Sequence, residues 1–351
     1  MEDFIKGRGA QFNSSNKFLS NRLTTDHLEG LDEPLLTNEK TVYLTEFPNS
    51  IVNKVNSPDL GLAYSLNPYQ GCEHGCIYCY ARNSHEYWGY SAGLDFERKI
   101  IVKKNAPELL KAFFDNPKWI PHPIMLSGNT DCYQPIERKL KITQDLLKVF
   151  LAYRHPVSII TKNSLIIRDI DLLKEMSLYN LVNVNITITS LNESLRLAME
   201  PRTATSGQRL KTVESLSKAG IPVNIMIAPI IPSLNNHEIP EIMKEASQRG
   251  ATSAGYTMVR LNGAIKTLFE DWIRKAFPDR AEKVLNQIAA CHGGKLSDSR
   301  WGVRMKGEGN IAKSIETLFM ISKQKYFKGN SRIDLCCSLF KRPERGQLNI
   351  F

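Results

Sequence analysis

The sequence predicts an α/β fold, a partial (β/α)6 barrel with an N-terminal arm before it and a basic helical C-terminal region after it. Short apolar runs rich in β-branched residues alternate with helical patterns at spacings of about thirty residues. This spacing is typical of parallel strand–helix units. Six strands are fewer than a closed eightfold barrel requires. The composition, 42% hydrophobic and 23% charged over 351 residues, excludes collagen, coiled coils and mainly disordered chains.

The elements follow in order along the chain. Residues 1–60 form the arm, because they are rich in Gly, Ser and Asn and hold one short strand candidate, around Thr41–Thr45. Residues 61–262 form the barrel, with strands near residues 66, 125, 158, 185, 225 and 256 and helices over Pro107–Phe114, Thr143–Tyr153, Arg168–Ser177, Ser206–Ala219 and Glu238–Gln248. Gly220 and Gly250 end the last two helices just before a strand. Residues 263–340 form the basic C-terminal region, with two or three more helices expected over 263–328 that end in the basic segment KQKYFKGNSR, and residues 341–351 form a tail.

The net charge of +10 is concentrated at one end of the sequence. Residues 251–351 hold 18 Lys and Arg against 9 Asp and Glu, whereas residues 1–250 hold 28 against 27. A basic excess of this kind favours a nucleic acid partner, and a solvated basic surface is the alternative. The sequence has no apolar run of membrane-spanning length and no secretory signal, so we expect no membrane partner and a cytoplasmic location.

Three of the seven cysteines form the sharpest motif. Cys72, Cys76 and Cys79 are spaced C-x3-C-x2-C in a short loop with two glycines, which allow the tight turns that bring three thiolates to one metal centre. Three ligands would leave one iron of a four-iron cluster open for a substrate. The alternative is a zinc site with His74 or His85 as the fourth ligand, although no second cysteine pair of the usual zinc spacing exists.

With Tyr78 as its aromatic residue, this loop resembles the cluster loop of the radical S-adenosylmethionine (SAM) superfamily. Further segments resemble the spore photoproduct lyase and DNA repair photolyase branch of that superfamily, in the right order over about residues 60–262. They are CYAR, KIIVKKNAPELL, SGNTDCYQPIE, ITSLNESLRLAMEPRTATSGQRL and AGIPVNIMIAPIIPSLN. The opening GRGAQFNSSNKF resembles the arm of an uncharacterised subgroup of the branch.

The resemblance implies a [4Fe–4S] cluster held by Cys72, Cys76 and Cys79, with SAM on the open iron and an electron donor such as flavodoxin or ferredoxin. The remaining SAM contacts are assigned by their place at strand ends. Ser127, Gly128 and Asn129 would meet the methionyl amino group, Thr189 and Ser190 the ribose or carboxylate, Arg202 the carboxylate, and Pro229, Ile230 and Ile231 the adenine. Alternatively, Thr189 and Ser190 cap a helix and Arg202 pairs with Glu200.

Three more residues are candidates for the chemistry on the substrate. The resemblance assigns Cys132 as a hydrogen donor to a product radical, and packing as a small buried hydrophobe is the alternative. In the aromatic run over residues 85–90, His85 and Tyr87 are candidates for proton or hydrogen relay, or for stacking an extruded base. The alternative for that run is a packed lid over the cluster.

These features predict a radical SAM enzyme of lyase type acting on nucleic acid. Radical modification of a protein or small molecule is the alternative, and in that case the basic region is incidental. The chain's last residues, Gln347–Phe351, resemble the short peptide by which bacterial replication and repair proteins dock on the DNA sliding clamp. Folding back of this tail onto the barrel is the alternative.

Overall fold

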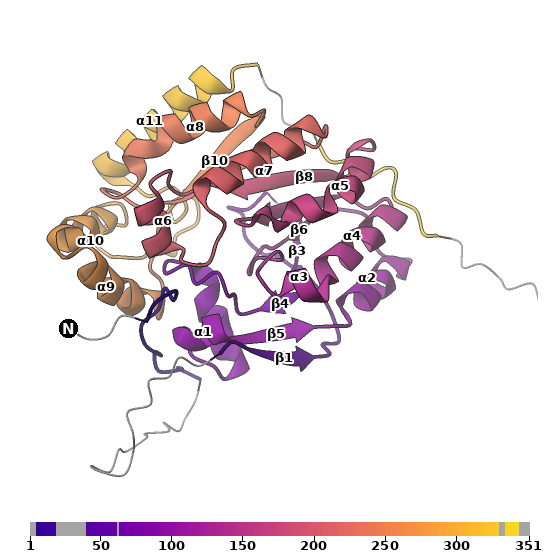
Figure 1. The fold of residues 1–351 in the computed structure, drawn as a ribbon, viewed down its shortest axis with the longest axis horizontal. Helices are drawn as coiled ribbons and strands as arrows, with labels where there is room; N and C mark the ends of the chain where they lie inside the picture. Colours follow the sequence, from indigo (N-terminus) through magenta and orange to yellow (C-terminus); the bar gives the residue numbers. More distant parts are fainter. Residues whose placement is uncertain (1–4, 19–39, 62, 330–333, 344–351) are drawn as a thin grey trace, which may run out of the picture.

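The main sheet of the computed structural model is an open arc of parallel strands (Figure 1). The structure describes residues 5–18, 40–61, 63–329 and 334–343. Its seven-stranded sheet has the order β10-β9-β8-β7-β6-β3-β2. The strands are β2 (Val52–Lys54), β3 (Tyr64–Leu66), β6 (Ile124–Leu126), β7 (Val157–Thr161), β8 (Val182–Thr187), β9 (Val223–Ile230) and β10 (Ser253–Met258). The six predicted parallel strands are confirmed, and β2 adds an antiparallel edge.

Helices follow these strands and cover the outer face of the arc (Figure 1). They are α2 (Ala106–Asp115), α4 (Ile142–Ala152), α5 (Ile170–Ser177), α7 (Ser206–Lys218) and α8 (Ile239–Gln248), each within a few residues of its predicted range. The alternation along the strands decides which side chains meet the helices. In β9, Val223, Ile225 and Ile227 are buried while Asn224 and Met226 between them are only half-buried.

A second sheet, absent from the sequence prediction, lies beside the first. It has the order β1-β5-β4, formed by β1 (Val42–Glu46), β5 (Lys99–Lys103) and β4 (Tyr69–Gln70). Only β1 matches a predicted strand. The short helical segments η1 (Tyr80–Trp88) and α1 (Leu94–Arg98) lead from β4 to β5. The cysteine motif directly follows β4, in the connection between β4 and η1.

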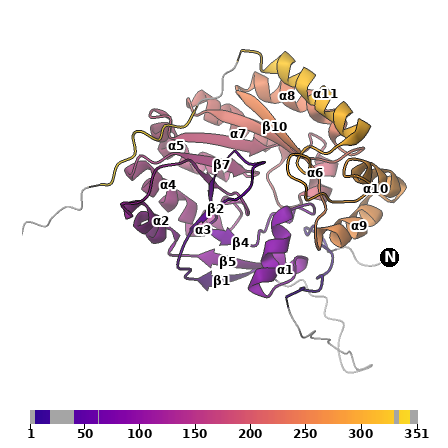
Figure 2. The same cartoon turned by 180° about the vertical axis from the view of Figure 1, so that it is seen from behind.

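The C-terminal region forms the predicted helices, here α9 (Ile265–Ala276), α10 (Ala281–Ala290) and α11 (Gly309–Tyr326). A shorter helix, α6 (Glu193–Met199), precedes α7, and Trp272 of α9 donates a 3.0 Å hydrogen bond to Ala198 O in α6. Helix α11 packs along α8 on the outer layer (Figure 2). None of the helices in the described part of the chain has the length and apolar character to cross a membrane. Residues Gln347–Phe351 lie outside the described residues, so clamp docking stays a prediction.

Candidate metal centre at the strand ends

Several segments predicted to form the site follow the carboxyl ends of the main strands, and hydrogen bonds join neighbouring segments at this edge. After β6, the Asn129 side-chain amide donates to Gln70 Oε1 (3.1 Å) in β4. At the end of β7, Thr161 donates to Asp131 Oδ1 (2.8 Å) in the segment after β6. After β10, the Asn262 carbonyl accepts from Asn83 (2.8 Å) in η1. This edge is where parallel α/β folds place their active sites.

The cysteine loop is fixed by contacts to its backbone. The Gln134 side chain spans the loop, donating to Gly71 O (3.1 Å) and accepting from Glu73 N (3.0 Å). Cys72 N donates to Phe96 O (2.8 Å) on the other side. Gly71 has φ +80°, and a Cβ there would lie 2.8 Å from Lys99 O, so the turn requires glycine.

The N-terminal arm docks directly on this loop. The buried Glu97 carboxylate accepts from Gly9 N (3.1 Å) and Ala10 N (2.8 Å), and it pairs with Arg82 at 2.5 Å. The approach is close enough that a Cβ on Gly9 would lie 1.8 Å from Gly75 O. The arm thus covers the outside of the cysteine loop.

The three thiols fit a metal cluster by their donor chemistry. Cys72 and Cys76 are buried, Cys79 is half-buried, and all seven cysteines of the chain are free. Burial raises the pKa of the Cys72 thiol, and so do the nearby thiolates of Cys76 and Cys79. Bound metal cations reverse this effect and hold coordinating thiols deprotonated. Among the described residues, no three Cys, His, Asp or Glu side chains are grouped so that they could hold a metal ion as they stand, so the fit rests on the donor type of the thiols and their spacing in one loop.

The two histidines of the zinc alternative lie in different surroundings. His74 uses both ring nitrogens, with Nδ1 3.4 Å from Asp131 Oδ2 and Nε2 3.1 Å from Asn163 Nδ2. His85 is fully buried and packs against Phe96 and Tyr90. Burial lowers its pKa to about 4, so its ring is neutral at physiological pH. These contacts disfavour a zinc site completed by His74, whereas both ring nitrogens of His85 have no hydrogen-bond partner among the described residues.

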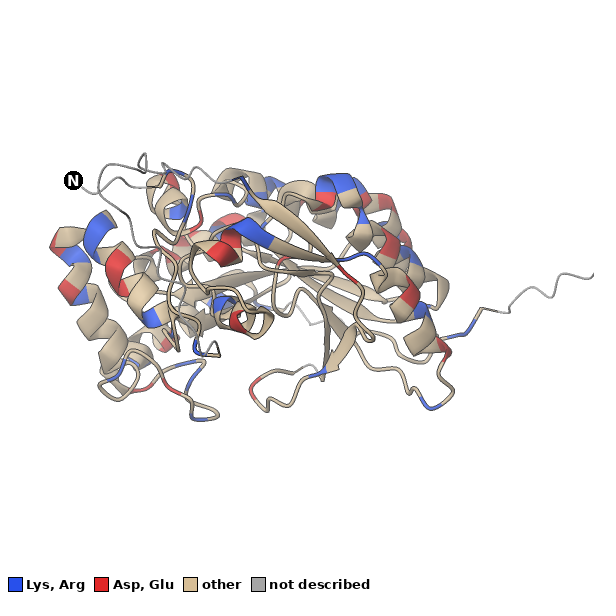
Figure 3. Cartoon of the chain, turned by 90° about the horizontal axis from the view of Figure 1, so that it is seen from below, with Lys and Arg blue, Asp and Glu red and all other residues tan. Residues whose placement is uncertain are grey.

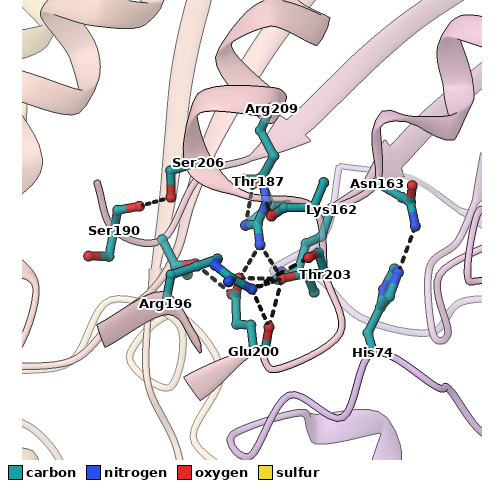
Figure 4. A network of polar contacts seen from close by, with 12 residues as sticks. His74, Lys162, Asn163, Thr187, Ser190, Arg196, Glu200, Thr203, Ser206 and Arg209 are labelled. Carbon is teal, nitrogen blue, oxygen red and sulfur yellow. Dashed lines mark hydrogen bonds and ion pairs between the residues drawn. The ribbon is translucent and has the colours of Figure 1, made fainter. Parts of the chain in front are cut away.

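A buried carboxylate, Glu200, lies at the centre of a network of polar contacts (Figure 4). It pairs with Arg209 of α7 and accepts hydrogen bonds from Tyr78 in the cysteine loop and from Thr189 after β8, the latter at 2.5 Å. Arg209 also donates to Thr187 O (3.0 Å). Burial would raise the pKa of Glu200, but the charges of Arg209 and Lys162 lower it to about 2. Glu200 and Arg209 were missed by the sequence analysis.

The predicted contacts of the methionyl amino group lie beside the cysteine loop. Ser127 has φ +73°, and its hydroxyl accepts from Cys132 N (2.7 Å), which makes a tight turn after β6. The Gly128 carbonyl accepts from the Tyr80 hydroxyl, one residue beyond Cys79. Asn129 holds this turn to β4 and to Ser84 (3.1 Å). Ser127, Gly128 and Asn129 are thus brought next to the cysteines.

Two of the alternatives for the remaining SAM contacts are wrong. Asn192, and not Thr189 or Ser190, caps α6, because its side chain accepts from Leu195 N (3.0 Å). Ser190 instead donates to Glu238 Oε1 (2.7 Å). Arg202 is 4.0 Å from Glu73, and its backbone N donates to His74 O, so it does not pair with Glu200.

The residues predicted to contact adenine and to act on the substrate differ in their burial. Ile230 and Cys132 are both fully buried in the main core, and burial raises the pKa of the Cys132 thiol. Tyr87 is 74% exposed and stacks on Phe18 with ring centroids 4.7 Å apart. His85 and Tyr87 therefore point to different environments, and the run over residues 85–90 is not a uniformly packed lid.

One cation of the site was also missed. Lys162 directly follows β7, is half-buried, and its Nζ lies 5.9 Å from the Tyr78 ring centroid. Its charge lowers the pKa of Cys76 and Cys79, against the larger effect of burial. Within the described residues, its ammonium has no hydrogen-bond or ion-pair partner. Its place at a strand end was visible in the sequence.

Comparisons with known proteins agree with this geometry. Residues 66–246, about half of the chain, match the model of the Radical SAM superfamily. An uncharacterized protein of Mycobacterium tuberculosis is 30% identical over 233 residues, covering 66% of this chain and 68% of its own length. An uncharacterized protein of Methanocaldococcus jannaschii is 31% identical over 229 residues, covering 65% and 82%.

The structure is also similar to that of spore photoproduct lyase. The form complexed with dinucleoside spore photoproduct superposes with a TM-score of 0.58 at 16% identity, covering 82% of this chain and 80% of the lyase. A variant lyase with bound AdoMet and dinucleoside spore photoproduct gives a TM-score of 0.57. At this identity the likeness establishes a common fold.

Proposed function

The chain belongs to the radical SAM superfamily, and we propose that it holds a [4Fe–4S] cluster at Cys72, Cys76 and Cys79, cleaves SAM reductively and acts on nucleic acid. Such a cluster, given one electron by a donor such as flavodoxin or ferredoxin, supplies the electron that splits SAM into methionine and a 5′-deoxyadenosyl radical. The observation that carries the proposal is the set of three free thiols on a loop fixed at the carboxyl edge of the sheet.

The residues of this chain would bind and orient SAM. Lys162 is the best partner for the methionyl carboxylate, because this half-buried cation next to the cysteine loop pairs with no anion among the described residues. Arg202, the partner expected from the sequence, lies further out and faces Glu73. Glu200 would position rather than bind, since its carboxylate is saturated by Arg209, Tyr78 and Thr189.

Support for a nucleic acid substrate comes from the fold shared with spore photoproduct lyase and from cations at the strand ends. The predicted basic segment does not add to it. Lys323 Nζ donates to Ala254 O (2.8 Å) near the amino end of β10, so this part of α11 lies toward the opposite edge of the sheet. Figure 3 shows Lys and Arg interspersed with Asp and Glu over the helices. This observation favours the second candidate, radical modification of a protein or small molecule.

The test is anaerobic reconstitution with iron, sulfide, SAM and a reductant, followed by quantification of 5′-deoxyadenosine. Parallel reactions contain undamaged DNA, ultraviolet-damaged DNA, RNA or no addition. We expect 5′-deoxyadenosine in every reaction, formed only when the three motif cysteines are present. We also expect its amount to increase when one of the nucleic acids is added. The matched control is the Cys291→Ala variant, whose thiol is buried near the end of α10. Absence of 5′-deoxyadenosine would refute the chemistry, and no response to any nucleic acid would refute the substrate.

A further inference from the structure

A second cation that has no partner among the described residues lies at the same edge of the sheet. Arg260 follows β10, and its backbone is fixed on both sides, by Val259 N to Ile230 O (2.9 Å) and Leu261 N to Leu296 O (2.9 Å). Its side chain is half-buried. Over the described ranges of the chain, the guanidinium has no hydrogen-bond or ion-pair partner. Burying a charge without a partner is costly, so an anion bound there would be stabilised.

The neighbouring carboxylate is already used by another arginine. Arg304 Nε lies 2.5 Å from Asp59 Oδ2, and Gly302 N donates to Asp59 Oδ1 (2.7 Å). Arg304 completes its contacts with a 2.7 Å hydrogen bond to Ser57 Oγ. Burial and the like charge of Arg304 both lower the pKa of Arg260, and Tyr80 and Asp59 offset this only in part. Two guanidinium groups thus lie near one carboxylate that pairs with Arg304, which leaves an excess positive charge.

Exposed aromatic rings flank this charge. Trp301 is 53% exposed, and the Arg304 guanidinium stacks over its ring at 3.7 Å from the centroid. Tyr80, which directly follows Cys79, is 50% exposed and interacts electrostatically with Arg260. Partly exposed aromatic rings beside a cation are a usual means of binding single-stranded nucleic acid, because bases stack on the rings while the cation meets the backbone.

We propose that Arg260 binds a backbone phosphate of single-stranded nucleic acid next to the reacting nucleotide, with Tyr80 and Trp301 stacking the neighbouring bases. The inference rests on the proposed function and deepens it by naming the surface that holds the substrate. Tyr80 connects this surface to the cysteine loop because it directly follows Cys79 in the sequence. Its hydroxyl also donates to Gly128 O in the turn after β6. The segment that follows Arg260 is joined to η1 by the hydrogen bond from the Asn83 side chain to Asn262 O. The surface is therefore held in place relative to the cysteines.

The experiment measures the affinity of the reconstituted holoenzyme for a fluorescently labelled 12-nucleotide single-stranded DNA by anisotropy, between 50 and 300 mM NaCl. Wild type is compared with Arg260→Gln and Arg260→Lys. The matched control is Arg300→Gln, because Arg300 lies in the same loop as Arg304 but is satisfied by Asp298 and Glu308. We expect Arg260→Gln to weaken binding about tenfold and to reduce the salt slope by about 0.7, with most of the affinity kept in Arg260→Lys and all of it in Arg300→Gln.

Formation of 5′-deoxyadenosine without DNA distinguishes a failure of the Arg260 proposal from a failure of the proposed function. Circular dichroism spectra and Tm values equal to those of wild type verify that each variant is folded. If Arg260→Gln cleaves SAM as wild type does and binds DNA more weakly, the proposal stands. If it binds DNA as wild type does, Arg260 is not a phosphate contact and the inference is wrong, although the proposed function survives. A raised KM for SAM in Arg260→Gln would reassign the residue to the SAM carboxylate. If wild type cleaves SAM but binds no oligonucleotide at any salt, the nucleic acid substrate itself is refuted.

Discussion

Replacing Glu200 by Gln is expected to lower the Tm of the protein by about 4 °C, because it removes one charge of a fully buried ion pair. The substitution preserves the size of the side chain and one carbonyl acceptor. It leaves the Arg209 guanidinium, which is also buried, without a counter-charge. The effect should therefore reflect the charge and not a cavity.

The magnitude follows from the pKa of the carboxyl. Burial would raise that pKa, but Arg209 and Lys162 lower it from the ordinary 4.5 to about 2. Because each pKa unit corresponds to about 1.4 kcal/mol, the ionised Glu200 stabilises the fold by about 3 kcal/mol at neutral pH. Breaking a buried ion pair by removing one partner costs a similar amount, about 3–5 kcal/mol. With an unfolding entropy of about 2.1 cal/mol/K per residue, 3 kcal/mol corresponds to about 4 °C in this chain.

The assay is thermal unfolding of anaerobically prepared protein followed by circular dichroism. Because the folded pKa lies below the unfolded one, the stabilisation is complete above about pH 4.5 and is lost as the pH falls toward 2. The difference between wild type and Glu200→Gln should therefore be constant from pH 8 to pH 5. Glu214→Gln is the control, since Glu214 forms an exposed pair with Lys218 on α7 and should leave the Tm unchanged. Equal Tm values for Glu200→Gln and wild type would refute the reasoning.

Three further outcomes are expected. Single replacement by Ala of any of the three motif cysteines should abolish the roughly 400 nm absorption of the cluster and SAM cleavage, and a full four-iron cluster in any variant would contradict the ligand assignment. Cys132→Ala should lower the Tm and leave the products unchanged, because the thiol is fully buried; altered products would assign it to radical quenching. Gly9→Val should displace the arm and accelerate bleaching of the cluster in air, whereas Gly61→Ala, where a Cβ meets nothing within 4 Å, should not; equal bleaching rates would show that the arm does not shield the cluster.

The parallel strands and the segments after them were predictable because both depend on local patterns. The alternation of strand and helix determines which residues reach the carboxyl edge, so the turn at Ser127–Asn129 was found beside the cysteines. Glu200 and Arg209 could not be found this way, since Glu200 meets Tyr78 across 122 positions of sequence. Lys162 was predictable in principle, because it follows the predicted strand over Val157–Thr161 as Ser127 follows its own.

The net charge predicted the position of the binding surface less well, because composition does not show on which face of the fold a charge lies. The basic excess of the last hundred residues suggested one binding face, yet its cations divide between the two edges of the sheet, with Lys323 near the amino end of β10 and Arg260 after its carboxyl end. The cations that we propose for binding are two at the carboxyl edge that have no partner among the described residues, Lys162 after β7 and Arg260 after β10. These strands are three positions apart in the sheet, which is about 14 Å at the usual strand spacing.

These two cations, which are far apart along the edge of the sheet, also have different neighbours. Lys162 faces the cysteine loop and the Tyr78 ring, where a small charged group next to the cluster would lie. Arg260 faces Arg304 and Tyr80, among exposed aromatic rings. A single carboxylate or phosphate is too small to explain two unpaired charges in different surroundings. We therefore propose two anion positions at this edge of the sheet, one for SAM and one for the nucleic acid of the proposed function.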